Sequence, residues 1–143
     1  MGADLWYQCI DPATNTYVIS LRFYRDCFGI DVPATENVTL ASTSCGQNIT
    51  LTLNQLPCPP SANGGIACEV SPLCPSYIGQ SQCANVNNPY PGVQAYTYTD
   101  TFQMPMACTD WVFSWDECCR NAAITNLNSP DTYDLYVQAT LNN

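Results

Sequence analysis

Residues 49–54 read Ile-Thr-Leu-Thr-Leu-Asn, and this stretch decides the fold class. Apolar and polar side chains alternate there with a period of two, so an extended segment has one apolar face and one polar face. Such alternation is typical of a strand in a sheet that packs one face on a core and exposes the other to water. The stretch therefore predicts a half-buried β-strand.

The same alternation recurs on both sides of this stretch. The segment 16–26 places four apolar side chains on one face: Tyr17, Ile19, Leu21 and Phe23. Further strands are expected at 4–10, 37–44, 93–103, 111–116 and 133–141, with a short one around 66–70. Seven or eight strands separated by turn residues predict an all-β fold, an immunoglobulin-like antiparallel β-sandwich stapled by disulfides.

Residues 57–92 interrupt this rhythm. They hold most of the prolines and four of the ten cysteines. Loops of this length are usually functional or disordered, and the cysteines argue against disorder. We expect one domain over residues 1–143, in keeping with the length prior, with 57–92 as an irregular, disulfide-stapled insertion.

The charge balance excludes several classes of function. The chain contains twelve acidic residues and only three basic ones, which gives a net charge of −9. It has no lysine and no histidine. Nucleic-acid binding needs a basic surface, and an anionic membrane would repel this chain. Without histidine there is no Ser-His-Asp or Cys-His catalysis, and without lysine there is no Schiff base. No nucleophile–base pair is visible, so we expect a protein that is not an enzyme. No segment reaches the ~18 apolar residues needed to span a membrane, so we expect no membrane insertion.

The ten cysteines predict an extracellular or cell-surface location. They are Cys9, Cys27, Cys45, Cys58, Cys68, Cys74, Cys83, Cys108, Cys118 and Cys119. An even number at this density is typical of an oxidising compartment and of up to five disulfides.

The pairing of these cysteines cannot be deduced from spacing alone. Neighbours in sequence suggest three disulfides: Cys58–Cys68, Cys74–Cys83 and Cys27–Cys45. The other four cysteines would then pair among themselves. Cys118 and Cys119 would point to opposite faces of a strand, and we expect them to bridge different partners.

Scarce charges suggest two further features. Arg120 is expected to act as a structural clamp, on Asp26 or on a strand-end carbonyl, because its forked donors suit either acceptor. A clamp on a ligand carboxylate is the alternative.

Calcium is the cofactor to consider, since several acidic residues lie near strand ends: Asp26, Asp31, Glu36, Asp110, Asp116 and Glu117. No contiguous calcium-loop pattern occurs, and the alternative is that these acids maintain solubility.

Aromatic residues in the insertion suggest a ligand site. Tyr77 and Tyr90 lie near Asn87, and aromatic faces flanked by amides suit a carbohydrate. The alternative is that both tyrosines pack over disulfides.

Six short strings give the chain a family resemblance. They are GADLxYxC at 2–9, FYRDC at 23–27, VSPLCP at 70–75, YxY at 96–98, CCRNAAITN at 118–126 and ATLNN at 139–143. Together they resemble the N-terminal module of very large secreted surface proteins of Bacteroidota. Those proteins are of the gliding-motility type and carry PKD-like or other immunoglobulin-like repeats and a C-terminal sorting domain. The resemblance implies an adhesin-like module and gives no catalytic residues to carry over.

The sequence thus favours a non-catalytic extracellular module of a large cell-surface protein, acting in adhesion or as a structural cap. Its partners would be an extracellular surface, a glycan or neighbouring domains of the same protein. One alternative is a carbohydrate-binding module that uses the loop aromatics. Another is a fibre subunit that assembles by strand exchange at an exposed sheet edge, in place of a monomer.

Overall fold

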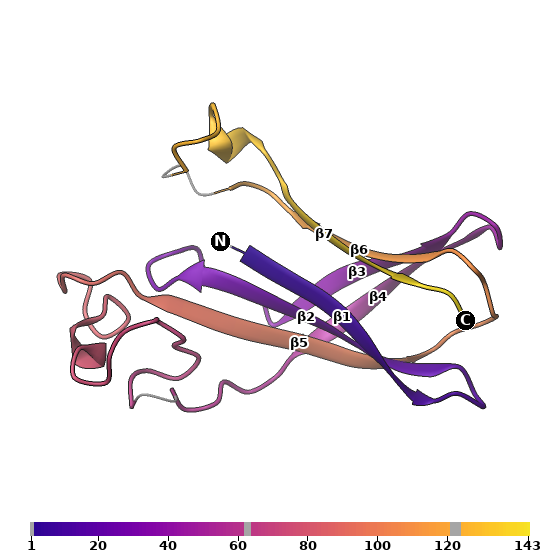
Figure 1. Cartoon of the computed structure of the whole chain (residues 1–143), viewed down its shortest axis with the longest axis horizontal. Helices are drawn as coiled ribbons and strands as arrows, with labels where there is room; N and C mark the ends of the chain where they lie inside the picture. Colours follow the sequence, from indigo (N-terminus) through magenta and orange to yellow (C-terminus); the bar gives the residue numbers. More distant parts are fainter. Residues whose placement is uncertain (1, 62–63, 121–123) are drawn as a thin grey trace.

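The computed structural model describes residues 2–61, 64–120 and 124–143 (Figure 1). Its strands are β1 (Gly2–Asp11), β2 (Thr16–Asp26), β3 (Thr35–Ser42), β4 (Gln47–Gln55), β5 (Val93–Gln103), β6 (Trp111–Glu117) and β7 (Leu135–Leu141). Two short 3-10 turns are η1 (Ile78–Gln80) and η2 (Pro130–Thr132). The all-β prediction is confirmed, and each of these strands was expected from sequence to within a few residues. No helix in the described part is long and apolar enough to cross a membrane.

The strands form one antiparallel sheet in the order β1-β2-β5-β4-β3-β6-β7. β4 pairs along its whole length with β3, but it meets β5 only at Asn54↔Thr99 and Gln55↔Tyr98. The sheet curls until β1 lies against β7, where the Tyr7 hydroxyl donates to the Thr140 carbonyl at 2.8 Å. The result is a nearly closed, barrel-like sheet. The two separate sheets expected for a sandwich are not seen, because β4 is hydrogen-bonded on both sides and joins the layers.

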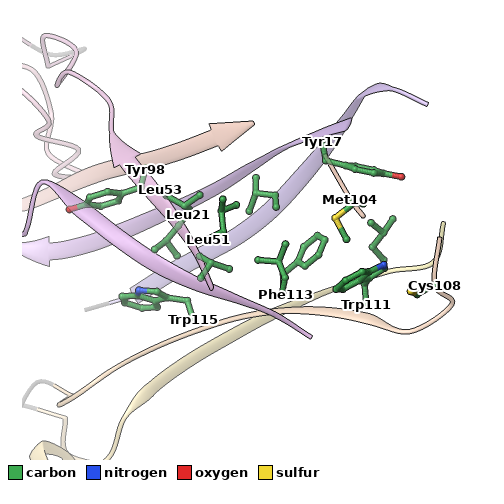
Figure 2. Close-up of a cluster of buried hydrophobic side chains, with 14 of the residues drawn as sticks. Tyr17, Leu21, Leu51, Leu53, Tyr98, Met104, Cys108, Trp111, Phe113 and Trp115 are labelled. Atoms are coloured by element: carbon green, nitrogen blue, oxygen red, sulfur yellow. The ribbon is translucent and has the colours of Figure 1, made fainter. Parts of the chain in front are cut away.

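Alternating side chains fill the space inside the curled sheet (Figure 2). The fully buried side chains of this hydrophobic core include Ile19, Leu21, Val38, Leu40, Leu53, Tyr98, Trp111 and Phe113. Burying a large apolar side chain contributes about 1.5–3 kcal/mol. The Phe113 ring meets the Tyr7 ring edge to face, with centroids 5.3 Å apart. The predicted inward faces of β2 and β4 are thus confirmed.

One buried polar group anchors the core to the loop after β2. The Tyr98 hydroxyl donates to the Pro33 carbonyl at 2.9 Å. Burial, with a smaller contribution from the negative charge of Glu36, raises the pKa of Tyr98 to about 12. The phenol therefore stays protonated and keeps its donor role over the whole neutral range.

Local hydrogen bonds set the turn between β1 and β2. The Asp11 carboxylate accepts hydrogen bonds from the Thr14 hydroxyl at 2.7 Å and from the backbone N–H of Ala13 at 2.9 Å. These bonds lower the pKa of Asp11. Asn15 closes the turn with a φ of 53°, a left-handed conformation that asparagine tolerates better than most residues.

The long connections all lie at one end of the molecule. Residues 27–34, 57–92 and 118–134 follow β2, β4 and β6, which run in the same direction, and we call the described parts of these segments the loop end. The loop end occupies the left side of Figure 1, and the three short connections lie at the right. The sheet therefore serves as a scaffold that gathers the irregular segments on one side.

Candidate ligand-binding groove at the loop end

Two disulfides brace the loop end. Cys58–Cys68 closes the first part of the insertion, as the sequence predicted. Cys27 pairs with Cys83, so the predictions Cys27–Cys45 and Cys74–Cys83 were wrong. The reason is the sheet order: β2 ends beside the start of β5, where the Cys27 N–H donates to the Gly92 carbonyl at 3.1 Å. The insertion therefore returns next to Cys27 before the chain enters β5.

The other cysteines also depart from expectation. Cys45 pairs with Cys108 and ties the turn after β3 to the segment before β6. Cys118 and Cys119 pair with each other, so the prediction that they bridge different partners was wrong. Cys9 and Cys74 are exposed free thiols. The described residues hold these four disulfides rather than five.

The first half of the insertion lies along β5. The Leu56 N–H donates to the Thr97 carbonyl at 2.8 Å, and the Val70 N–H donates to the Val93 carbonyl at 2.8 Å. The short strand expected around 66–70 is reduced to one isolated bridge, Glu69↔Gln94. The described parts of this segment are thus attached to β5 at both ends.

A buried carboxylate holds this segment in shape. Glu69 is only 3% exposed. It accepts hydrogen bonds from the Ser71 hydroxyl at 2.8 Å and from the Ile66 N–H at 3.1 Å. The Ser71 hydroxyl in turn accepts from the Val93 N–H at 2.9 Å. Because buried polar groups need partners, this network fixes the loop backbone relative to β5.

A groove of about 830 Å³ lies between this segment and the outer face of β2 and β5. Its lining comprises Arg22, Tyr24, Leu56, Pro57, Pro59, Pro60, Cys68, Glu69, Val70, Ala95 and Thr97. Ligand pockets usually measure about 300–1,000 Å³ and combine apolar walls with a few polar groups. The groove meets both criteria.

Arg22 is the cationic group of the groove. Its Nε donates to the Thr97 hydroxyl at 3.3 Å, and its guanidinium lies 5.5 Å from the centre of the Trp6 ring. Among the described residues the ion pair is Arg25–Asp31, at 3.2 Å, so Arg22 has no acidic partner. An arginine in this state can bind a carboxylate with its two terminal nitrogens.

Tyr24 supplies an aromatic wall next to Arg22. Its hydroxyl donates to the Asp4 carboxylate at 3.0 Å, which fixes the ring across β1 and β2. The lining of the groove therefore combines an aromatic ring, a guanidinium, the hydroxyl of Thr97 and the hydrogen-bonded Glu69 with apolar residues of the insertion.

Arg120 contacts the chain just before β7. Its Nε donates to the Asp134 carbonyl at 3.0 Å, and its backbone N–H donates to the Tyr133 carbonyl at 3.0 Å. Of the two partners expected for Arg120, Asp26 or a carbonyl at the end of a strand, the structure shows a carbonyl next to the start of β7. The expected partner Asp26 accepts, through its own carbonyl, the N–H of Gly29 at 2.7 Å.

Of the acidic residues weighed as calcium ligands, Asp31, Glu36 and Glu117 line one cavity, and Asp26, Asp110 and Asp116 lie outside its lining. Within residues 2–61, 64–120 and 124–143, no group of three or more acidic, cysteine or histidine side chains is arranged to hold a metal ion. Asp31 pairs with Arg25, and Asp116 is exposed on β6. The Asp110 carboxylate accepts hydrogen bonds from the hydroxyls of Ser42 and Ser44 and from the Ser44 N–H. These bonds lower the pKa of Asp110 to about 2. They also tie the turn after β3 to the residue that precedes β6.

The structure brings together two of the three residues expected to bind a glycan. The rings of Tyr77 and Tyr90 meet edge to face, with centroids 5.6 Å apart, and Tyr77 is exposed. Asn87 is exposed in a turn where its N–H donates to the side chain of Asn85 at 3.0 Å. Their binding of a sugar stays a prediction.

Sequence reasoning missed the groove. The available signal was that Trp6, Arg22 and Tyr24 all occupy outward positions of strands, where aromatic residues and the rare cation were unexplained. The groove itself depends on the register between β2 and β5, which sets Thr97 opposite Arg22 and Ala95 opposite Tyr24, and this register cannot be read from the sequence.

Comparisons with known proteins identified no relative of this chain. No family model matches this chain, and neither the curated proteins nor the solved structures yield a match. Functional inference therefore rests on the residues themselves.

Proposed function

We propose that this chain is a non-catalytic recognition module of an extracellular cell-surface protein, acting in adhesion, and that it binds its ligand in the groove over β2 and β5. The observation that carries the proposal is Arg22. It lines a groove of about 830 Å³ and has no acidic partner among the described residues, in a chain whose net charge is −9.

The fold supports a recognition role. The ladder between β4 and β5 holds only two residue pairs, so the strand order divides there into β1-β2-β5 and β4-β3-β6-β7. The runs β1-β2-β5 and β3-β6-β7 match the A-B-E and C-F-G runs of a constant-type immunoglobulin domain, whereas β4 pairs mainly with β3. We therefore keep the immunoglobulin-like assignment as part of the proposal. In such folds the loops at one end of the scaffold carry recognition, and here that end is braced by disulfides. Four disulfides and the resemblance to secreted surface proteins of Bacteroidota support an extracellular location.

The ligand that best fits the groove is a saccharide that carries a carboxylate. Ring faces of sugars stack on aromatic side chains, and Tyr24 lines the groove. The Thr97 hydroxyl can exchange hydrogen bonds with sugar hydroxyls, and Arg22 can take the carboxylate with two parallel hydrogen bonds.

An array of acidic and neutral glycans tests this proposal. Arg22→Gln and Tyr24→Ala should abolish or strongly reduce binding to acidic glycans. Tyr136→Ala is the matched control, because Tyr136 is an exposed tyrosine (52%) on β7, away from the groove. Equal binding by wild type and both groove variants would refute the proposal.

The Tyr77–Tyr90 pair carries a second candidate, binding of a neutral glycan at the loop end. Its support is the contact between the two rings, together with the exposure of Tyr77. On the same array Tyr77→Ala would then lose binding to neutral glycans, while Arg22→Gln would keep it.

Strand exchange is the third candidate. β1 and β7 are the two edges of the sheet, and no ladder pairs them in the described residues. Assembly through these edges would give SDS-resistant oligomers that disappear when β7 is deleted. A stable monomer in size-exclusion chromatography with light scattering would exclude it.

A further inference from the structure

A second, smaller cavity lies between the loop after β2 and the end of β6. It measures about 220 Å³. Its apolar walls are Phe23, Ile30, Val32, Pro33, Trp115 and the Cys118–Cys119 disulfide. The rings of Phe23 and Trp115 lie 5.7 Å apart, edge to face. The cavity is smaller than a typical drug-sized pocket, so it suits one functional group on a short stem.

Carboxylates complete the lining of this cavity. Glu36 accepts a hydrogen bond from Trp115 Nε1 at 3.1 Å, and Glu117 stands at the end of the same strand as Trp115. Burial raises the pKa of Glu36, and the negative charge of Glu117 raises it further. Asp31 also lines the cavity, but Arg25 neutralises it at 3.2 Å. Among the described residues, neither Glu36 nor Glu117 has a cationic partner.

We propose that this cavity binds an alkylammonium group, with the ammonium between Glu36 and Glu117 and the alkyl stem against Phe23 and Trp115. Aromatic faces attract organic cations, and two carboxylates without a cation supply the countercharge. The chain has no lysine, so no side chain of a second copy can provide such a group. The ammonium comes from another molecule, as a lysine side chain of a protein partner or as a small free amine.

The surroundings distinguish this site from a metal site. Calcium and magnesium require six or more oxygen ligands around the ion, or a shell of retained water. Here most of the lining is apolar, and the described residues contain no cluster suited to a metal. An organic cation uses both parts of the lining, because its stem contacts the apolar walls while its charge faces the carboxylates.

Nuclear magnetic resonance can test the site directly. The indole N–H of Trp115 donates to Glu36, so its ¹H–¹⁵N cross-peak reports on the cavity. Titration with n-butylammonium chloride should move this peak saturably. The same concentrations of n-butanol and of sodium chloride should leave it in place. The indole peak of the fully buried Trp111 serves as an internal control for the fold.

Variants test the role of the charge. Glu117→Gln and Glu36→Gln should each weaken binding by about threefold to tenfold, the range for losing one partly exposed charge partner. Asp116→Asn removes the same charge from the adjacent, exposed position of β6, which does not line the cavity, and should leave the affinity unchanged. Equal shifts with n-butanol, or equal weakening by Asp116→Asn, would overturn the proposal.

Comparing the binding of two further ligands identifies the source of the ammonium. Cadaverine represents a free amine, and Nα-acetyl-lysine-N-methylamide represents a lysine in a protein. Tighter binding of cadaverine would assign the site to small amines, and tighter binding of the lysine derivative would assign it to a protein partner. If neither moves the Trp115 peak, the site does not exist.

Discussion

Removing each of two disulfides should destabilise the fold by different amounts. Cys45–Cys108 spans 63 residues and Cys58–Cys68 spans 10. The loop-entropy relation gives a loss of about 4.3 kcal/mol for the longer loop at 25 °C and about 2.7 kcal/mol for the shorter one. The two pairs are matched in burial, since each joins one buried cysteine, Cys108 or Cys68, to a half-buried one. Cavity effects should therefore largely cancel, and the difference of about 1.6 kcal/mol reflects loop length.

Equilibrium unfolding in urea at 25 °C measures this difference. The variant with Cys45→Ala and Cys108→Ala should have the lower free energy of unfolding, and the variant with Cys58→Ala and Cys68→Ala the higher one. Both should lie below the wild type. Equal values, or the reverse order, would refute the reasoning that these two pairs form and act mainly on the unfolded chain.

Three further substitutions test other parts of the structure. Phe113→Ala should reduce the free energy of unfolding by about 3–5 kcal/mol in the same assay, because it empties a fully buried site; a loss below 1 kcal/mol would contradict the core. Glu36→Gln should raise Tm at pH 7 but not below pH 4. The raised pKa of Glu36 means that its contribution to stability is full below its ordinary pKa of 4.5 and is lost as pH rises through the folded-state value. Asp110→Asn should lower Tm at pH 7, and the gap should close as pH falls from 3.8 towards 2, because the folded-state pKa of Asp110 is about 2. Scanning calorimetry across pH checks both, and a pH-independent difference would contradict either argument.

The strands could be predicted because burial imposes a period of two on each of them. In β4 the alternation of Ile49, Leu51 and Leu53 with threonines marks the inward face, and Leu53 is fully buried. In β6 the same logic places Trp111 and Phe113 in the core. This signal is local, so it can be recognised in the sequence without knowing which strands are neighbours.

The disulfides and the groove could not be predicted because both depend on strand order and register. Cys27 meets Cys83 only because β2 lies beside β5, and 56 residues separate the two cysteines in sequence. The groove arises where Arg22 and Thr97 face each other across the same pair of strands, beneath the insertion. The local sequence around Arg22 or Thr97 does not indicate which residue lies opposite it in the sheet.

The most direct test of the central claim is a chemical-shift titration of ¹⁵N-labelled protein with a uronate disaccharide. The account predicts saturable shifts of the backbone peaks of Arg22, Tyr24, Ala95 and Thr97, and the loss of these shifts in Arg22→Gln. Shifts confined to Tyr77 and Tyr90, or no saturable shifts at the groove, would contradict it.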